Sequence, residues 1–415
     1  MRLAVAPAVV LLLGACAGSM PAAMPGPAPT QPLPAGARSI DDDLAFLQSH
    51  APVEVLEAPG GGRVVVSARW QARVMTSAVE PHGASLGFVH RTFIEAGKTG
   101  TAFDNYGGED RFWLGPEGGQ FGLYFPPGAP FAIGSWQVPH EMQEGEWAVT
   151  ARDAAHVTFT RRMHVVSWSG SALDVAVERT VRVLGAEDVR ARFGVAPPDG
   201  SRWVAFESDN RITNAGATAW TRDKGLPSIW ILGMYSPAPD AQVLVPFDPG
   251  GTGPVVNDAY FGKVPADRLV VHDEGWLSLR ADGQYRSKIG LSPARARDVA
   301  GSYSASARLL TLVHYAKPAS APDGYVNSLW AKQPDPYGGD VVNAYNDGPT
   351  EPGKPSLGGF YELETSSPAA ALAPRQSMEH VHTTLHVTGD EAALDGLARR
   401  VLGVSIAQGA ARPAR

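Results

Sequence analysis

The chain alternates between hydrophobic and polar residues over much of its length, which is the pattern of β-strands with one face in a hydrophobic core. The alternation is clearest in five segments, residues 63–66, 156–160, 173–179, 309–314 and 380–386. Turn-forming pairs such as Asp199-Gly200 and Asp282-Gly283 lie between segments of this kind. The pattern predicts an antiparallel all-β fold.

Short amphipathic helices are expected at the two ends of this body. Ser39 is a preferred N-cap residue, and it is followed by three acidic residues at 41–43 and an apolar face at 44–47. A second helix is expected from Glu391 to near Gly403, because leucine and valine recur there at helical spacing and arginines lie in the last turn.

Between these helices there is no break in composition and no repeat of fixed period. We therefore expect one large antiparallel β-sandwich domain over residues 39–406, followed by a disordered tail at 407–415. The 415 residues include 46 glycines and 35 prolines, which suits many tight turns better than long helices.

Composition excludes several classes of protein. A hydrophobic content of 44% excludes an intrinsically disordered chain, and the short apolar segments exclude a protein with several membrane spans. The chain has 35 basic and 42 acidic residues, a net charge of -7, and no cluster of basic residues. A nucleic-acid partner is not expected, because such binding depends on many phosphate contacts from basic side chains.

The N-terminus has the features of a lipoprotein signal. Arg2 is followed by a short apolar run, by the small residues Gly14 and Ala15, and by Cys16, the only cysteine of the chain. Residues 1–15 are therefore predicted to be an export signal and Cys16 the lipid anchor. The alternative is an ordinary signal peptide that is cleaved nearby, with Cys16 incidental.

Residues 16–38 are rich in proline, alanine and glycine, and we expect them to form a semi-stiff tether. Ala17 follows the cysteine where an aspartate would signal retention in an inner membrane. The expected location is that of an exported protein anchored by its lipid at the outer membrane or facing the periplasm. The membrane is thus a predicted partner, and the oligomeric state stays open.

Three stretches with many polar, aromatic and glycine residues interrupt the strand pattern. In the first, residues 105–121, aromatic rings could stack on a sugar ring while charged groups bind its hydroxyls. The alternative is a buried network of arginine and carboxylates that holds a loop. The candidate ligand-binding residues of this stretch are Tyr106, Glu109, Asp110, Arg111, Trp113 and Glu117.

The second stretch, residues 335–348, contains the candidate binding residues Asn343, Asn346 and Asp347. Its spacing does not match an EF-hand, so a structured loop is favoured over a calcium site. The third stretch, residues 360–368, reads as a strand that places Glu362 and Glu364 on one face. Two adjacent like charges require a raised pKa or a cationic partner, and paired carboxylates suit acid/base chemistry.

Three histidines, His380, His382 and His386, share one face of a predicted strand. Two of them could chelate a metal, but no third ligand follows from the spacing, and ordinary core or surface histidines are the alternative. We predict no metal and no cofactor. Motifs for other nucleophilic or nucleotide chemistry are missing from the sequence, including G-x-S-x-G, the Walker A motif and H-E-x-x-H.

Several segments together resemble an uncharacterised family of bacterial secreted lipoproteins. The resemblance covers nearly the whole mature domain and implies a galactose-mutarotase-like β-supersandwich, with no reaction assigned. The segments are residues 106–119, 228–234, 256–265 and 361–368.

A more distant resemblance is to the aldose 1-epimerases. Leu363-Glu364-Thr365, Leu372-Ala373-Pro374-Arg375 and Thr383-Thr384-Leu385-His386 follow the order of that family's base-bearing strand, turn and last strand. This resemblance implies that Glu364 is the general base. The epimerases use a histidine as the acid, and the matching region here, residues 230–237, contains none.

Two main hypotheses for function follow. In the first, the protein is a carbohydrate-active enzyme in which Glu364 takes the proton of an anomeric hydroxyl, while Glu362, His380 or His382 protonates the ring oxygen. In the second, it is a non-catalytic glycan-binding lipoprotein. Its aromatic contacts would come from Tyr106, Trp113, Trp230 and Trp330. A structural envelope lipoprotein without a small ligand is a third class.

The anchor hypothesis makes a direct prediction. Cys16→Ser should move the protein from the membrane to the soluble exported fraction without changing its melting temperature, because the tether lies outside the core. Fractionation and thermal unfolding measure the two effects. A variant that stays with the membrane would place the anchor elsewhere.

Overall fold

The computed structural model describes residue 33 and residues 37–410, and it is mostly β-structure. The predicted signal, Cys16 and the tether up to residue 36 lie outside the described residues apart from Leu33, as do residues 411–415. Within the described part of the chain, no helix is long and apolar enough to cross a membrane.

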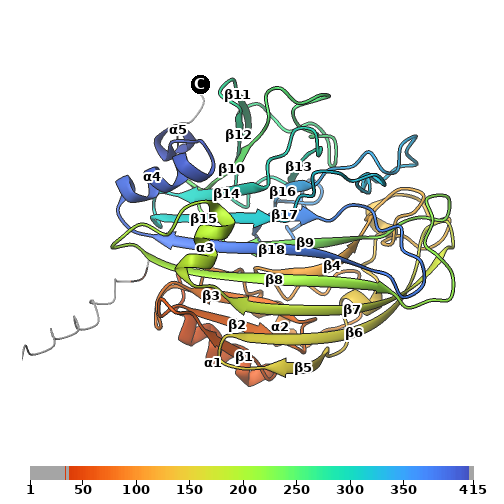
Figure 1. Cartoon of the computed structure of the whole chain (residues 1–415), viewed down its shortest axis with the longest axis horizontal. Helices are drawn as coiled ribbons and strands as arrows, with labels where there is room; N and C mark the ends of the chain where they lie inside the picture. The colour runs from red at the N-terminus through yellow and green to blue at the C-terminus, as the bar shows by residue number, and fades with distance from the viewer. Residues whose placement is uncertain (1–32, 34–36, 411–415) are drawn as a thin grey trace, which may run out of the picture. The chain divides into compact units, whose positions relative to one another are not determined.

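The largest sheet has ten antiparallel strands, which Figure 1 shows side by side from β11 to β5. Its strand order is β11-β12-β10-β14-β15-β18-β8-β7-β6-β5. The strands are β5 (Ala148–Arg152), β6 (His156–Val166), β7 (Ala172–Val183), β8 (Arg202–Asn214), β10 (Gln242–Pro246), β11 (Leu269–His272), β12 (Trp276–Arg280), β14 (Val299–Ser304), β15 (Leu309–Tyr315) and β18 (Ser377–Thr388).

A second sheet of five antiparallel strands has the order β13-β16-β17-β9-β4. These strands are β4 (Arg111–Gly115), β9 (Ser228–Tyr235), β13 (Ser287–Leu291), β16 (Val342–Asn346) and β17 (Tyr361–Ser366). A third, small sheet contains β1 (Glu54–Glu57), β2 (Arg63–Ser67) and β3 (Arg73–Ala78). The predicted all-β sandwich class is confirmed.

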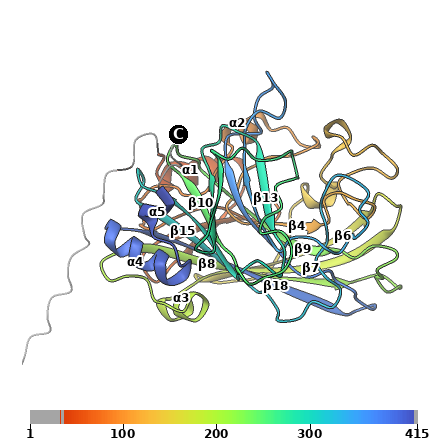
Figure 2. The ribbon, with the colours of Figure 1, turned by 90° about the horizontal axis from the view of Figure 1, so that it is seen from above.

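The helices are short and lie at the ends and connections of the sheets. They are α1 (Ile40–His50), α2 (Arg91–Ala96), the 3-10 turns η1 (Ile133–Ser135) and η2 (His140–Met142), α3 (Ala186–Phe193), α4 (Glu391–Val401) and α5 (Ile406–Ala410). Helices α3 and α4 pack on the face of the ten-stranded sheet that carries Ala205 and Leu385, as the view in Figure 2 shows for α3.

Both predicted terminal helices are present. Ser39 caps α1 by accepting a hydrogen bond from the backbone N–H of Asp42 at 3.1 Å. The prediction of a disordered tail is wrong for residues 407–410, because these residues belong to α5. Asp395 of α4 accepts hydrogen bonds from Ser405 and from the N–H of Ile406, and the buried Ile406 side chain joins the core around α4.

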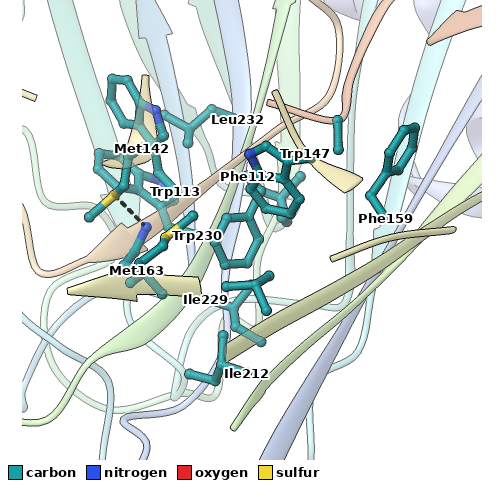
Figure 3. Close-up of a cluster of buried hydrophobic side chains, with 14 of the residues drawn as sticks. Phe112, Trp113, Met142, Trp147, Phe159, Met163, Ile212, Ile229, Trp230 and Leu232 are labelled. Atoms are coloured by element: carbon teal, nitrogen blue, oxygen red, sulfur yellow. Dashed lines mark hydrogen bonds between the residues drawn. The ribbon is translucent and has the colours of Figure 1, made fainter. Parts of the chain in front are cut away.

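The hydrophobic core lies between the five-stranded and the ten-stranded sheets. Phe112 of β4 and Ile229 of β9 belong to one hydrophobic cluster with Phe159 of β6 and Ile212 of β8, and Figure 3 shows these side chains. Farther along, Leu363 of β17 packs in one cluster with residues of β10, β12 and β15. The inner face of the five-stranded sheet is therefore committed to packing, and its other face is left for polar side chains.

The five alternating segments of the sequence form β2, β6, β7, β15 and β18, as predicted. Two of the stretches that were expected to interrupt the strands each contain a strand. Residues 105–121 contain β4, and residues 335–348 contain β16. Every residue of these two strands is buried, so they lack the alternation that would have marked them as strands.

The core packing can be tested at Phe112, whose side chain is 1% exposed between the two sheets. Phe112→Ala should lower the free energy of unfolding by about 3–5 kcal/mol, because it removes packing and leaves a cavity. Val149→Ala, at a position that is 38% exposed, is the control and should change it by less than about 1 kcal/mol. Urea unfolding of both variants is the measurement, and equal losses would contradict the assignment of Phe112 to the core.

Candidate functional site

The candidate site is built on the outer face of the five-stranded sheet. Strand β17 lies between β16 and β9, with Glu362 opposite Tyr345 and Met234, and Glu364 opposite Asn343 and Leu232. Because side chains alternate along a strand, Glu362 and Glu364 share the face that points away from the core. We call this the carboxylate face. Its other polar and aromatic side chains are Arg111, Trp113, Trp230, Lys288, Asn343 and Tyr345.

Each carboxylate is bound by a cation from another strand. Arg111 of β4 donates from Nη2 to Oε1 of Glu362 at 2.8 Å. Lys288 of β13 donates from Nζ to Oε2 of Glu364 at 2.8 Å, and Nε1 of Trp230 donates to the same oxygen at 3.0 Å. These side chains are at most 7% exposed, so both ion pairs lie out of water. The sequence argument asked for a raised pKa or a cationic partner, and the structure gives each carboxylate a cationic partner.

Burial has shifted the protonation equilibria of this face. It raises the pKa of Glu362 to about 7, and the charge of Glu364 adds to this rise, while Arg111 and Lys288 oppose it. Burial also raises the pKa of Glu117. For Lys288 burial acts to lower the pKa, but Glu364 and Glu117 outweigh it and hold the pKa above its ordinary value. Glu362 is thus poised to exchange a proton near neutral pH.

Aromatic rings from four connecting segments lie over the carboxylate face, and we call Phe103, Trp136, Phe261 and Trp330 the aromatic cover. Trp136 stacks on Trp330 with 6.3 Å between ring centroids, and Phe103 and Phe261 contact these two rings edge-on. The cover also contacts the face itself: Phe103 meets Trp113 at 5.7 Å, and Phe261 meets Tyr345 at 6.1 Å.

Glu117 joins the cover to the face. Its Oε1 accepts a hydrogen bond from Nε1 of Trp136 at 2.9 Å. The charges of Lys288 and Glu364 both act on its pKa, which places the carboxyl close to them. The result is a layer of three carboxyl groups and two cations under aromatic rings.

Several buried polar atoms of this layer have no hydrogen-bond partner among the described residues. They are Oε1 of Glu364, Oγ of Ser228, Nε of Arg111, Nε of Arg286, and Nε1 of Trp113 and of Trp330. Buried polar groups are nearly always paired in folded proteins, so a group of six such atoms in one place needs an explanation. A polar ligand that hydrogen-bonds to them would supply one.

The structure brings together about half of the residues singled out in the sequence. Arg111, Trp113, Trp230 and Asn343 lie on the carboxylate face with the two glutamates. Glu117 and Trp330 lie in the layer above them. Asn343 donates from Nδ2 to the hydroxyl of Tyr260 at 3.1 Å, and this hydroxyl in turn binds Asp340.

Glu109, Asp110, His380 and His382 lie on the other side of the five-stranded sheet. Asp110 forms an ion pair with Arg179 of β7 at 2.5 Å, and Glu109 binds His386 of β18 at 2.8 Å. Asp110 precedes Arg111 in the chain and so points to the opposite face. Glu109 and Asp110, which were candidate ligand-binding residues, therefore do not lie on the face that carries Glu364.

The two histidines occupy the layer between the sheets. His380 and His382 both lie 2.9 Å from Oγ1 of Thr365, the β17 residue whose side chain points inward. Burial lowers the pKa of His380 to about 3 and that of His382 to about 4. Neither contacts Glu362 or Glu364, so the structure does not bring them to the candidate site. No group of three or more metal-ligating side chains occurs in the described part of the chain.

Three further candidates make structural contacts. Tyr106 packs against Trp70 in the cluster under α1. Asn346 points to the opposite face from Asn343 and holds the turn at Gly283. Asp347 accepts hydrogen bonds from the hydroxyl of Tyr345 and from the N–H of Gly359, so it anchors the loop before β17.

Lys288, Arg286, Trp136 and Tyr260 belong to the site and were not singled out from the sequence. A lysine within the short apolar segment Ser287–Leu291 was the available signal, because a charge in a buried strand needs a partner. The other three come from loops, where no periodic pattern indicates which way a side chain points.

A separate depression of about 760 Å³ lies over β6, β7 and β8 on the outer face of the ten-stranded sheet. Two of its three arginines are already engaged: Arg211 pairs with Glu379, and Arg161 binds backbone carbonyls. None of the candidate residues lines it. We therefore place the candidate site at the carboxylate face, where the perturbed and unpartnered groups gather.

Comparison with known proteins adds the family. A family model described as a family of unknown function (DUF6786) matches residues 38–411. The chain belongs to this family. No curated protein sequence matches it significantly.

Several solved structures are similar to this member of DUF6786. A proposed aldose 1-epimerase from Escherichia coli K12 is 12% identical, with a TM-score of 0.50, over 81% of this chain and 98% of that one. A protein from Synechocystis sp. PCC 6803 is 11% identical, with a TM-score of 0.46, over 82% and 96%. A galactose mutarotase related enzyme from Lactobacillus acidophilus is 9% identical, with a TM-score of 0.44, over 81% and 98%. The fold is galactose-mutarotase-like.

The raised pKa of Glu362 predicts how stability changes with pH. Its value of about 7 in the folded protein lies above the ordinary 4.5, so the folded protein binds this proton more tightly than the unfolded chain. The resulting stabilisation is complete below about pH 4.5 and is lost as the pH rises through about 7. Its size is on the order of 3 kcal/mol.

The side chain of the Glu362→Gln variant cannot titrate, so this variant should not show the loss of stability as the pH rises through about 7. The measurement is the free energy of unfolding in urea at pH 5 and at pH 8, for the wild type and for Glu362→Gln. Subtracting the change of the variant from that of the wild type cancels the contributions of the other titrating groups. The same change in unfolding free energy between the two pH values in both proteins would contradict the assigned pKa.

Proposed function

We propose that this protein is a carbohydrate-active lipoprotein of the cell envelope that performs acid/base chemistry on a sugar at the carboxylate face. The observation that carries the proposal is the pair Glu362 and Glu364. One of these carboxyl groups has a pKa near neutrality, and the other has an unpartnered oxygen under aromatic rings. The galactose-mutarotase-like fold is shared with a proposed aldose 1-epimerase, which supports a sugar as the ligand.

The composition of the layer suits a sugar. Indole rings such as Trp113, Trp230 and Trp330 suit the C–H side of a pyranose, and the N–H groups of Trp113 and Trp330, which have no partner among the described residues, can donate to hydroxyls. The carboxylates accept hydrogen bonds from hydroxyl groups. Such a mixture of stacking and hydrogen bonding is less suited to a purely apolar ligand.

The two glutamates have different roles in the proposed chemistry. Lys288 and Trp230 both donate to Oε2 of Glu364, so Oε1 remains as the atom that accepts the proton of the anomeric hydroxyl. Glu362 with a pKa of about 7 is protonated in a large fraction of molecules at neutral pH and donates its proton to the ring oxygen. The C1–O5 bond then breaks to give the open-chain aldehyde, and reclosure reverses both proton transfers.

This assignment supplies an acid where the epimerase histidine is missing from residues 230–237. It also replaces His380 and His382 in that role, because they lie on the other side of the sheet. The chemistry uses no cofactor.

A non-catalytic glycan-binding lipoprotein is the second candidate. The specific observation in its favour is the ion pair of Glu364 with Lys288, since a neighbouring ammonium group makes a carboxylate a weaker base. A binder would use the same carboxylate face for hydroxyl groups without moving a proton. Both candidates include the predicted export and lipid anchoring at Cys16, and we propose the cell envelope as the location of the site.

Matched variants distinguish the two candidates. Anomer interconversion of free neutral and acidic aldoses is followed by NMR or polarimetry, and sugar binding is measured by calorimetry. If the proposal holds, Glu364→Gln and Glu362→Gln should each lower the rate by about 10²–10⁴-fold, while sugar binding survives. Glu379→Gln, at an exposed glutamate of β18 that pairs with Arg211, is the control and should match the wild type.

If the wild type binds a sugar but does not accelerate anomer interconversion, the proposed epimerase chemistry is wrong and the glycan-binding function is supported. If neither binding nor turnover occurs with any sugar of the panel, the proposal of a carbohydrate site is itself wrong.

A further inference from the structure

Arg286 is a cation of the candidate site that the proposed chemistry does not use. It precedes β13, two residues before Lys288, and its guanidinium lies 3.7 Å from the ring centroid of Phe261 and 6.0 Å from that of Trp330. Its positive charge acts on the pKa of Glu117 and of Tyr345, so it faces the same layer as the carboxylate face.

The charge of Arg286 is not compensated by a carboxylate, unlike the charges of the other two cations of the site. Arg111 and Lys288 each form an ion pair with a carboxylate at 2.8 Å. Among the described residues, no carboxylate lies within ion-pair distance of Arg286, and its Nε is buried without a hydrogen-bond partner. A guanidinium that is partly withdrawn from water and lacks an anionic partner is costly.

The unpartnered atoms of the layer are mostly donors. Nε of Arg286, Nε of Arg111, and Nε1 of Trp113 and of Trp330 all donate, Oε1 of Glu364 accepts, and the hydroxyl of Ser228 can do either. A neutral sugar offers hydroxyl groups that both donate and accept. Four donors against one acceptor and one hydroxyl suit a ligand that adds acceptor oxygens and a negative charge.

We infer that the site takes a sugar carrying an acidic group and that Arg286 binds this group. The inference rests on the proposed function, because it names the class of sugar for the same site. A carboxylate, as in a uronic acid, and a phosphate ester share the required chemistry of several acceptor oxygens on one anion. Both bind guanidinium groups by charge-assisted hydrogen bonds.

The geometry assigns different parts of the ligand to different parts of the site. Glu362 and Glu364 face the reacting end of the sugar, and their cations are already committed to them. Arg286 lies at the aromatic cover, beside Phe261 and Trp330 and in contact with the hydroxyl of Tyr345. Because no carboxylate of the described residues pairs with it, it can hold an acidic substituent away from the reacting carbon. Acidic sugars should therefore be bound through a contact that the proton transfer does not need.

The test compares the affinities of the wild type for galactose, galacturonate and galactose 6-phosphate by calorimetry. The affinity for at least one acidic sugar should exceed that for galactose by about 10- to 100-fold, as expected for a hydrogen bond to a charged group. Galacturonate and galactose 6-phosphate distinguish a carboxylate from a phosphate as the acidic group.

Variants then assign the preference to Arg286. Arg286→Gln should lower the ratio of the affinities for the acidic sugar and for galactose to about one, and Arg286→Lys should keep part of the preference. The matched control is Arg222→Gln, because Arg222 also lies over an aromatic ring, 4.2 Å from Tyr337, but carries an ion-pair contact with Asp323 and lies outside the site. Circular dichroism melting of each variant verifies that it is folded.

The outcomes separate the inference from the proposed function. If galactose binds as tightly as both acidic sugars, the inference is wrong, whereas the proposed carbohydrate site is supported. A preference for acidic sugars that survives in Arg286→Gln would overturn the role of Arg286. Binding of no sugar would remove the proposed function and the inference together.

Discussion

The ion pairs Glu362–Arg111 and Glu364–Lys288 are the interactions on which the rest of the site depends. They put four charged side chains in a layer that water scarcely reaches, and removing one partner of such a pair typically costs about 3–5 kcal/mol because the other charge stays buried. Their members come from β4, β13 and β17, which are far apart in the sequence. The carboxylate face therefore exists only when the five-stranded sheet is assembled in its register.

Strand β17 separates two polar layers with different tasks. Its inward residue Thr365 links to His380 and His382 between the sheets, where the histidines stay uncharged. Its outward residues Glu362 and Glu364 carry the charges of the site. Shifting the strand by one residue would exchange the two faces and place the carboxylates in the core. The same alternation that builds the sandwich thus positions the candidate chemistry.

The aromatic cover links the fold to the proposed function. Rings that keep water from the carboxylate face also weaken dielectric screening, which is the reason that Glu362 holds its proton to about pH 7 beside an arginine. The same rings offer surfaces for a sugar. Burial, protonation and ligand recognition are consequences of one arrangement.

The all-β class, the terminal helices, the alternating strands and the pairing of Glu362 with Glu364 on one face followed from the sequence by itself. These features depend on residues close together in the chain, whose periodicity is visible directly. Only the tertiary structure decided that Glu109, Asp110 and the histidines lie across the sheet, and that Lys288 and Arg286 join the site. Strands buried on both faces, such as β4 and β16, lack a periodic pattern of hydrophobic residues, and so do loops. The neighbours of a charged group are therefore set by sheet pairing and packing, which can join residues about 250 positions apart in the sequence.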